Sequence, residues 1–320
     1  MENYIFDEEL ILIGEDGTID VNLASGKYWV SNHAHVLRAN KNIDQRYLLE
    51  FLKTVHFEVY NTGTIQPKLN KETCKSIPIK IPKSVEEQNK IANFLLKIDN
   101  KINLLENKHN YYLNFKKYLM QQIFTQKLRF DFNVNWHEYT FKELLYEVNE
   151  KTTVNNQYEI LSSTKEGIYT QKKYFADRNV ASKNNIGYKI LRKNQIVLSP
   201  QNLWMGNINV NTEFDIGIVS PSYKIYENTM LLKISYFKHI IKLPRLIYEY
   251  KCASEQGASI VRRNLNKQLF DEIKIYIPSL EEQEKIGNML NSIDRKIDNI
   301  MNQIIQIKDF KKGLLQQMFV

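Results

Sequence analysis

Two stretches of this 320-residue chain are near-copies of each other, EEQNKIANFLLKID at residues 86–99 and EEQEKIGNMLNSID at residues 281–294. Extended without gaps to residues 124 and 319, the two copies agree at 19 of 39 positions. Agreement of this length at a fixed offset of 195 residues indicates an internal repeat. The two copies therefore divide the chain into a segment before the first copy and a segment between the copies.

Each copy has the pattern of a long helix with a coiled-coil seam. Apolar residues recur at alternating steps of four and three, which gives a period of 3.5 residues. The first copy carries His109 and Lys116 in this seam, and the second carries Lys311. Such polar seam residues fix the register of a coiled coil, or they mark where the helices separate or meet another subunit.

Two related apolar stripes in one chain can bury each other. We therefore expect one intramolecular coiled coil, antiparallel because a whole domain connects its helices. The alternative is that each helix packs on its own domain. The residues expected at the helix–helix or subunit contact are Ile98, Ile102, Phe115, Leu119, Ile293, Ile297, Phe310 and Leu314.

The repeat also extends upstream of the helices. LNKETCKSIPIKIP at 69–82 matches LNKQLFDEIKIYIP at 265–278, and both read as an alternating isoleucine strand that ends in proline. Ser84 and Ser279 are expected helix N-caps, and the Glu-Glu pair that follows each suits the positive end of a helix dipole. The repeated unit is thus a strand, a proline and a long helix.

The composition is that of a globular protein with a basic middle. Hydrophobic residues make up 43% and charged residues 25%, and the net charge is +8. Residues 136–274 contain 20 Lys and Arg against 14 Asp and Glu, whereas residues 1–81 contain 9 against 11. A basic domain suits a polyanionic partner. No apolar run is long enough to span a membrane and no signal peptide is recognised, so a cytoplasmic protein is expected.

The segment between the helices predicts an α+β domain with polar loops on a β scaffold. Its strand–turn–strand stretches include IVLSPQNLWMGNINV at 196–210 and IGIVSPSYKIYE at 216–227, and residues 236–251 read as helical despite Pro244. Side chains of the types that hold phosphates or base edges lie in its loops, with solvated loops or core aromatics as the alternative. The candidate nucleic-acid-binding residues are Ser163, Lys165, Tyr169, Lys172, Lys173, Gln201, Asn202, Trp204, Ser222, Tyr223, Arg262 and Arg263.

The sequence offers no catalytic or metal-binding motif. It contains neither a phosphate-binding glycine loop nor the Asn/Asp-Pro-Pro-Tyr stretch of aminomethyltransferases. His33 and His35 could share a strand face, but no further ligand completes a metal site with them. The two cysteines, Cys74 and Cys252, lack the spacing of a zinc site. A non-catalytic recognition protein is expected.

These features together resemble the DNA-specificity (S) subunits of type I restriction–modification systems. The resemblance rests on IPIKIPKSVEEQNKIANFLLKID followed by KKYLMQQIF, and on IYIPSLEEQEKIGNMLNSID followed by KKGLLQQMF. The stretches GKYWVSNHAHVL, GIVSPSY and RRNLNKQLFDEIKI resemble target-recognition domains. The fold implied is α+β, with α/β target-recognition domains joined by two long helices in an antiparallel coiled coil.

The resemblance implies a role in a larger complex. Each recognition domain would read one half of a split site in double-stranded DNA, and the helices would set the spacing of the halves. Methyltransferase (M) subunits would modify adenine at N6, and restriction (R) subunits would translocate and cleave DNA. S-adenosylmethionine, ATP and Mg would lie on those partners, with no cofactor bound by this chain.

The implied domains are unequal. They are a partial first recognition domain at 1–81, a first spacer helix at 82–128, a second, complete recognition domain at 129–277 and a second spacer helix at 278–320. The first domain resembles only the second half of a full one. We expect a homodimer or a complementing S fragment to supply the rest, or else a truncated or silent recombination cassette. A plain coiled-coil interaction protein is a further alternative.

Overall fold

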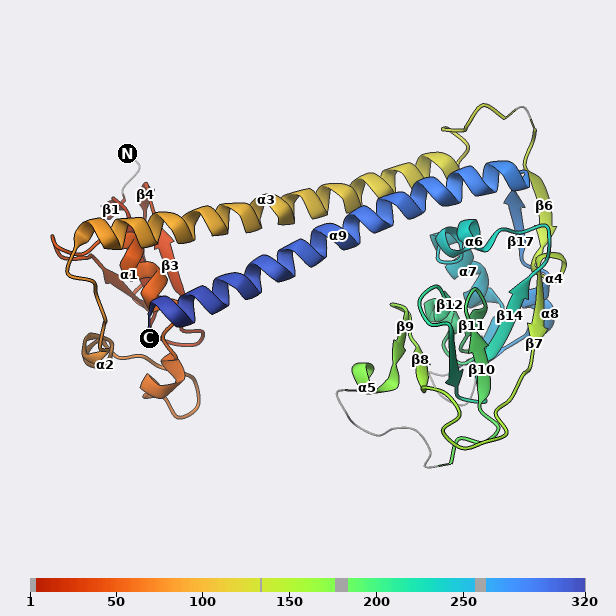
Figure 1. Cartoon of the computed structure of the whole chain (residues 1–320), viewed down its shortest axis with the longest axis horizontal. Helices are drawn as coiled ribbons and strands as arrows, with labels where there is room; N and C mark the ends of the chain where they lie inside the picture. Colours follow the sequence, from red (N-terminus) through yellow and green to blue (C-terminus); the bar gives the residue numbers. More distant parts are fainter. Residues whose placement is uncertain (1–3, 133, 176–183, 257–262, 320) are drawn as a thin grey trace. The chain divides into compact units, whose positions relative to one another are not determined.

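The computed structural model describes residues 4–132, 134–175, 184–256 and 263–319 (Figure 1). The chain divides into two compact units, and both long helices contribute to each of them. Unit 1 comprises Met1–Asn114 and Lys296–Val320, and unit 2 comprises Phe115–Arg295. The long helices are α3 (Val85–Phe124) and α9 (Leu280–Met318).

Unit 1 contains a small antiparallel sheet with strand order β3-β2-β5 and a separate β1-β4 pair. Helix α1 packs against this sheet, and its N-terminus is capped by the Asp44 side chain, which accepts from the Tyr47 N–H. Besides parts of α3 and α9, the elements are β1 (Phe6–Asp7), β2 (Leu10–Gly14), β3 (Val21–Ala24), β4 (Lys27–Tyr28), β5 (Ala34–Leu37), α1 (Gln45–Leu52), the 3-10 turn η1 (Phe57–Tyr60) and α2 (Lys71–Ser76).

The core of unit 1 lies between strand β2 and helix α1. Ile11 and Ile13 of β2 are fully buried against Leu48 and Leu52 of α1, and Leu69 closes the cluster. Two histidines of this unit, His33 and His35, have local partners. His35 Nε2 lies 2.6 Å from the carbonyl oxygen of Leu69, and His33 Nδ1 lies 2.9 Å from the Asp16 carboxylate.

Unit 2 is a mixed helix and strand unit, as the sequence predicted. Its first half contains β6 (His137–Thr140), α4 (Phe141–Leu144), β7 (Leu145–Val148), β8 (Leu161–Ser163), β9 (Ile168–Thr170), α5 (Gln171–Tyr174), β10 (Lys189–Arg192), β11 (Ile196–Leu198) and the 3-10 turn η2 (Leu203–Met205). Its second half contains β12 (Ile208–Val210), β13 (Ile216–Val219), β14 (Lys224–Asn228), α6 (Ile234–Ile240), α7 (Pro244–Cys252), β15 (Ser254–Gln256), β16 (Arg263–Leu265), α8 (Lys267–Asp271) and β17 (Lys274–Ile277).

The main sheet of unit 2 has the order β12-β11-β14-β7. The segment 196–210 forms the antiparallel β11–β12 pair that was predicted. The strands of segment 216–227 also form, but they do not pair with each other: β13 pairs with β10 and β14 with β11. Of the two central strands of the sheet, β11 is fully buried, and β14 is buried at Ile225 and Tyr226.

Residues 236–251 do not form the single helix expected from their pattern. Helix α6 ends at Ile240, and α7 starts at Pro244. Proline has no N–H to donate to a preceding turn, but it fits the first position of a helix, where that donor has no helical partner. The same residue therefore separates two short helices instead of bending one.

The expected antiparallel pairing of the long helices is present within each unit. In unit 1, Ile98 and Ile102 of α3 are buried against Ile307 and Leu314 of α9. Further along α3, Leu105 meets Ile300 and Ile304. Partner numbers on α9 fall as those on α3 rise, so the two helices are antiparallel. Other seam residues that were predicted are also buried, namely Leu119, Ile293 and Ile297.

Two predicted contact residues lie outside the buried seam. The side chain of Phe310 is 56% exposed, because the neighbouring Lys311 holds the seam position of this turn. Phe115 is half-buried, and the seam position beside it is held by Lys116. The four-three spacing locates the seam correctly, and Phe310 lies beside it, so a contact of Phe310 with another subunit stays a prediction.

Equivalent positions of the repeat form equivalent ion pairs. In unit 1, Lys311 Nζ lies 2.7 Å from the Asp99 carboxylate and 2.9 Å from that of Glu50. In unit 2, Lys116 pairs with Asp294. Asp99 corresponds to Asp294 in the repeat, and Lys116 corresponds to Lys311. Seam lysines therefore bind the opposite helix, which supports their expected role in fixing register.

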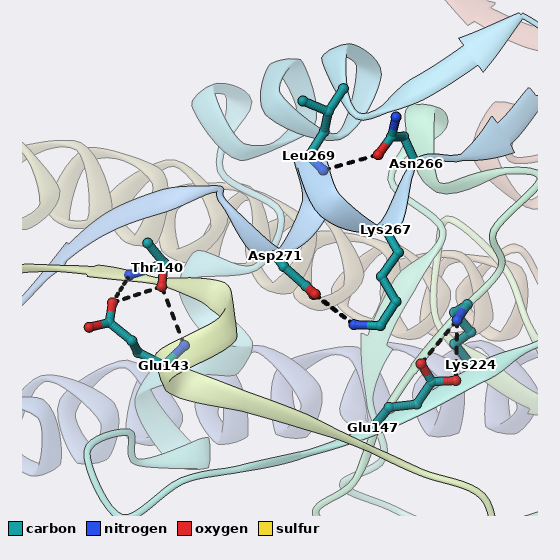
Figure 2. Close-up of polar contacts among 8 residues, drawn as sticks. All are labelled: Thr140, Glu143, Glu147, Lys224, Asn266, Lys267, Leu269 and Asp271. Atoms are coloured by element: carbon teal, nitrogen blue, oxygen red, sulfur yellow. Dashed lines mark hydrogen bonds and ion pairs between the residues drawn. The ribbon is translucent and has the colours of Figure 1, made fainter.

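The match upstream of the helices is also structural. Asn70 caps α2 by accepting from the N–H of Thr73, and Asn266 caps α8 by accepting from the N–H of Leu269. Figure 2 shows the second of these caps. In the same view, Lys224 of β14 reaches the Glu147 carboxylate of β7 and ties the edge of the main sheet.

One predicted strand is absent. Residues 274–277 form β17, which pairs with β6, whereas the matching residues 77–82 form no strand in the described structure. The sequence pattern is the same in both places. The difference is the partner, because a β-ladder needs a second strand and unit 1 has no described counterpart of β6.

Candidate nucleic-acid interface

The candidate residues of unit 2 lie on a hairpin and on loops that flank the main sheet. The hairpin consists of β8 and β9, with a tight turn at Thr164–Gly167 in which the Thr164 N–H donates to the Gly167 carbonyl over 2.8 Å. The turn exposes Lys165, whose amine lies 3.6 Å from the Glu166 carboxylate. A cation on such a turn can reach a phosphate, since exposed ion pairs are weak and exchange readily.

A buried amide network holds this turn in place. The hydroxyl of Ser163 donates to Asn207 Oδ1 over 2.8 Å, and Asn209 Nδ2 donates to the same hydroxyl over 2.7 Å. Asn209 also donates to the carbonyl of Thr164. Lys242 completes the network by donating to Asn209 Oδ1 and to the Lys165 carbonyl. The turn therefore projects from a fixed base.

Two candidate residues belong to that base instead of the surface. Ser163 is 3% exposed, and its hydroxyl is fully engaged within the network. Tyr223 is half-buried against the core, and its hydroxyl donates to the Ser163 carbonyl over 3.1 Å. Burial raises the pKa of the Tyr223 phenol. Both side chains position the loops, and neither presents its polar group to a ligand.

Helix α5 follows β9 directly (Figure 1). It carries two adjacent exposed lysines, Lys172 and Lys173. Thr170 caps this short helix by accepting from the Lys173 N–H. Tyr169 stacks on Tyr174 with ring centroids 5.9 Å apart, which fixes the aromatic side of the hairpin. The hairpin and α5 thus present cations and aromatic faces together, a combination that suits a nucleic-acid strand.

A second group of candidates lies at turn η2. Gln201 is exposed there, and its carbonyl accepts from the Arg263 N–H over 3.2 Å. The Arg263 guanidinium lies over the Trp204 ring at 4.7 Å. The main chain of Asn202 holds the turn, since its carbonyl accepts from the N–H groups of Met205 and Asn207. Arg262 lies outside the described residues.

Asn207 connects the two groups. Its carbonyl accepts from the Ser199 N–H near η2, and its side chain bonds to Ser163 at the start of the hairpin turn. Ser222 is exposed on a third loop, with its hydroxyl 3.0 Å from that of Ser220. The structure therefore joins two of the predicted loops, the hairpin turn and the η2 turn, through one buried asparagine that sequence reasoning missed.

The missed residues had a detectable signal. Asn209 lies in β12, and Asn207 and Asn211 flank it on either side, so an extended assignment of this segment places all three amides on one face. All three are nearly inaccessible to solvent, and buried amides must be hydrogen-bonded. Lys242 had no such signal, because its partners are distant in sequence. Burial lowers the pKa of its amine, and the nearby Glu166 carboxylate opposes that shift.

A pocket of about 210 Å³ lies beside this network. Its lining includes Glu166, Asn209, Phe214, Lys238 and Lys242. Among the described residues, no three His, Cys, Asp or Glu side chains converge in a way that could hold a metal ion. No described helix has the length and apolar character needed to cross a bilayer.

The comparison with protein families decides the relationship. The model of the type I restriction modification DNA specificity domain matches residues 1–113 and 133–309. The chain belongs to this family. Specificity-family proteins are DNA-recognition proteins, which agrees with the exposed cations and amides described above.

Curated relatives support the assignment over shorter stretches. A putative type I restriction enzyme specificity subunit of Haemophilus influenzae is 33% identical over 87 residues, covering 26% of this chain and 23% of the relative. The MjaX specificity subunit of Methanocaldococcus jannaschii, described as putative, is 27% identical over 314 residues, covering 88% of this chain and 68% of the relative. The match to the H. influenzae protein thus spans about a quarter of that protein's length.

Solved structures show the specificity-subunit fold. The S subunit of a type I restriction–modification system from M. genitalium superposes with a TM-score of 0.64 at 15% identity, over 100% of this chain and 85% of the other. A chain from a study of complex assembly and conformational transition of the type I R-M system gives 0.53 at 14% identity, over 99% and 83%.

Proposed function

We propose that this chain is a DNA-reading specificity subunit whose unit 2 recognises one part of a split site in double-stranded DNA. The observation that carries the proposal is the surface of unit 2. Exposed Lys165, Lys172, Lys173 and Gln201, together with the Arg263–Trp204 pair, stand on a rigid base of buried amides. Lysine and arginine can bind phosphates, and glutamine can read adenine.

The other roles follow from family membership and belong to the same proposal. Residues 1–81 would be a partial recognition domain, 129–277 a complete one, and 82–128 and 278–320 the spacer helices. Two methyltransferase subunits would bind this scaffold and supply N6-adenine methylation, and restriction subunits would join them. S-adenosylmethionine, ATP and Mg would be bound by those partners, and this chain would carry out no chemical step.

Methylation mapping tests the proposal directly. The chain is co-expressed with its methyltransferase subunit in a host that lacks adenine methylation, and N6-methyladenine is mapped by single-molecule sequencing. We expect one defined sequence motif. Absence of methylation, with the methyltransferase subunit shown to be folded and present, would instead favour a silent fragment.

Matched variants test which residues of unit 2 contact the DNA bases. Gln201→Ala should relax or change the motif at one or two base positions, because a bidentate amide contact is worth about 1–3 kcal/mol of discrimination. Lys193→Ala is the control, since Lys193 lies beyond the other end of β11 and pairs with Asp215. An unchanged motif in Gln201→Ala would remove this residue from the interface.

A further inference from the structure

In unit 2, a segment from earlier in the chain contacts strand β17 and the start of helix α9. Strand β6 pairs with β17 in the register Ile275 to Tyr139. Just upstream, Arg129 forms a bidentate ion pair with the Glu282 carboxylate, and the Trp136 Nε1–H points to the same carboxylate at 3.4 Å. Glu282 is completely buried as a result.

Unit 1 contains the residues that correspond to β17 and to the start of α9, but no described segment pairs with them. Residues 77–82 correspond to 273–278, and Glu87 corresponds to Glu282. Ile79 is 38% exposed where Ile275 is 5% exposed, and Glu87 is exposed where Glu282 is buried. In the described part of the chain, no lysine or arginine forms an ion pair with Glu87. We call residues 77–82 with Glu87 the acceptor edge.

The acceptor edge retains the geometry needed for a strand. In unit 2 the Ile273 carbonyl accepts from the Phe141 N–H, so alternate residues Ile275 and Ile277 also turn their main-chain groups to β6. The counterparts in unit 1 are Ile79 and Ile81, which make no main-chain hydrogen bond to another described residue.

The remaining positions of the edge are compatible with pairing. Pro78 corresponds to Lys274, whose main chain faces away from β6, so the missing N–H of proline costs no ladder bond. The carbonyl of Lys80 faces away too, and it already accepts from the Tyr47 hydroxyl. The exposed Lys80 side chain corresponds to Tyr276, which lies opposite Glu138 in the ladder. An acidic residue on an incoming strand would therefore meet a cation.

We propose that the acceptor edge binds the β6-type segment of a separate polypeptide that carries the first half of a recognition domain. Its chemistry is set by the filled copy: an arginine for Glu87, a tryptophan seven residues later, and a strand with an acidic residue opposite Lys80. A second copy of this chain is a poor occupant, because its own β6 is engaged with β17 and its Arg129 with Glu282. This interaction goes beyond DNA recognition and can be measured without DNA.

A peptide of residues 129–145 is the probe, since it contains the arginine, the tryptophan and the strand of the filled copy. Titrated into the full chain, the fluorescein-labelled peptide should bind saturably with one site per chain. N-methylation at Tyr139, which faces Ile79 in the inferred register, should weaken binding about tenfold, the equivalent of one or two lost hydrogen bonds. N-methylation at Glu138, which faces away, should leave binding unchanged.

Charge variants identify the site as unit 1. Glu87→Gln in the protein and Arg129→Gln in the peptide should each weaken binding several-fold, and the double change should cost no more than either alone. Glu86→Gln is the matched control, because Glu86 pairs with Lys90 on the exposed face of α3. Three results would each overturn the proposal. They are equal binding of both N-methylated peptides, no binding at about 1 mM peptide, and a dimer of the chain that persists in sedimentation when peptide is added.

Discussion

At the scale of single residues, corresponding places in the two units make contacts of different chemistry. Glu50 of α1 reaches Lys311, and His239 of α6 lies 3.8 Å from Asp294. Each residue comes from the helix that packs on the coiled coil in its own unit. In unit 1 the contact is an ion pair. In unit 2 it is not, because burial lowers the pKa of His239 to about 4, so the imidazole is neutral near pH 7.

Lys311 should be the most important cation of unit 1. Its side chain is 14% exposed, and its hydrogen bonds with Asp99 and Glu50 outweigh desolvation and raise the pKa of the amine. Lys311→Met leaves the Asp99 carboxylate without a cation and Glu50 with only Lys53, so we expect a loss of about 2–3 kcal/mol in the free energy of unfolding. Urea denaturation measures it. Lys308→Met is the control, since its pair with Glu106 is exposed and should cost under about 0.5 kcal/mol.

His239 should make unit 2 sensitive to mild acid. An unfolded-state histidine has a pKa of about 6.5, so the unfolded chain binds more protons than the folded one between pH 6.5 and 4. The contribution is fully present above pH 6.5 and is lost as the pH falls, by about 2–3 kcal/mol at pH 4.5.

The comparison with His239→Gln isolates this effect. Glutamine can keep a hydrogen bond to Asn291, the present partner of the imidazole, but it does not titrate. Lys116 opposes and Asp294 favours protonation of the imidazole, and both remain in the variant. Parallel stability curves of the two proteins between pH 7 and 4.5 would contradict the assignment.

At the scale of elements, one glutamine in each repeat joins a long helix to its neighbouring domain. Gln88 accepts from the Asp44 N–H and donates to the carbonyls of Asn42 and Pro82. Gln283 accepts from the Lys233 N–H and donates to the carbonyls of Leu231 and Pro278. Both side chains are 1% exposed. The glutamine of each EEQ motif thus holds the N-terminus of α1 against α3 and the N-terminus of α6 against α9.

Replacing this glutamine should loosen the junction. Gln283→Leu keeps the volume but leaves one N–H and two carbonyls without their partner, which costs about 2–3 kcal/mol of unfolding free energy. Hydrogen exchange at the first turn of α6 should accelerate in the variant. The exposed Gln303 provides the control, because Gln303→Leu removes only a 3.5 Å contact with Asn299. Equal exchange rates in both variants would refute the junction role.

The elements also show what the sequence can and cannot predict. The four-three spacing located the seam and its lysines, because a helix surface depends on local period alone. The alternating isoleucines predicted a strand at 77–82, but none forms there. A strand needs a partner strand, and that partner is distant in sequence. The loop sequence makes Ser163 and Tyr223 candidate DNA contacts for the same reason, with a core aromatic as the alternative for Tyr223. Their burial is set by Asn207 and the hairpin, and no local signal reports it.

At the scale of the whole molecule, charge is divided unequally along the chain. Residues 136–274 hold an excess of six cations, whereas residues 1–81 hold an excess of two anions, as the counts of 20 against 14 and 9 against 11 give. Non-specific attraction to DNA comes almost entirely from phosphate neutralisation. The basic segment should therefore supply most of the salt dependence of binding.

The salt slope of DNA binding tests this division on the full chain. Each phosphate contact adds about 0.9 to the slope of log K against log salt concentration. Lys172→Gln with Lys173→Gln should therefore lower the slope by about 1.8 if both lysines contact phosphates. The paired control is Lys75→Gln with Lys90→Gln, two exposed lysines of unit 1 that already pair with glutamates. A slope that falls only in the control would place the phosphate contacts in unit 1, against the charge distribution.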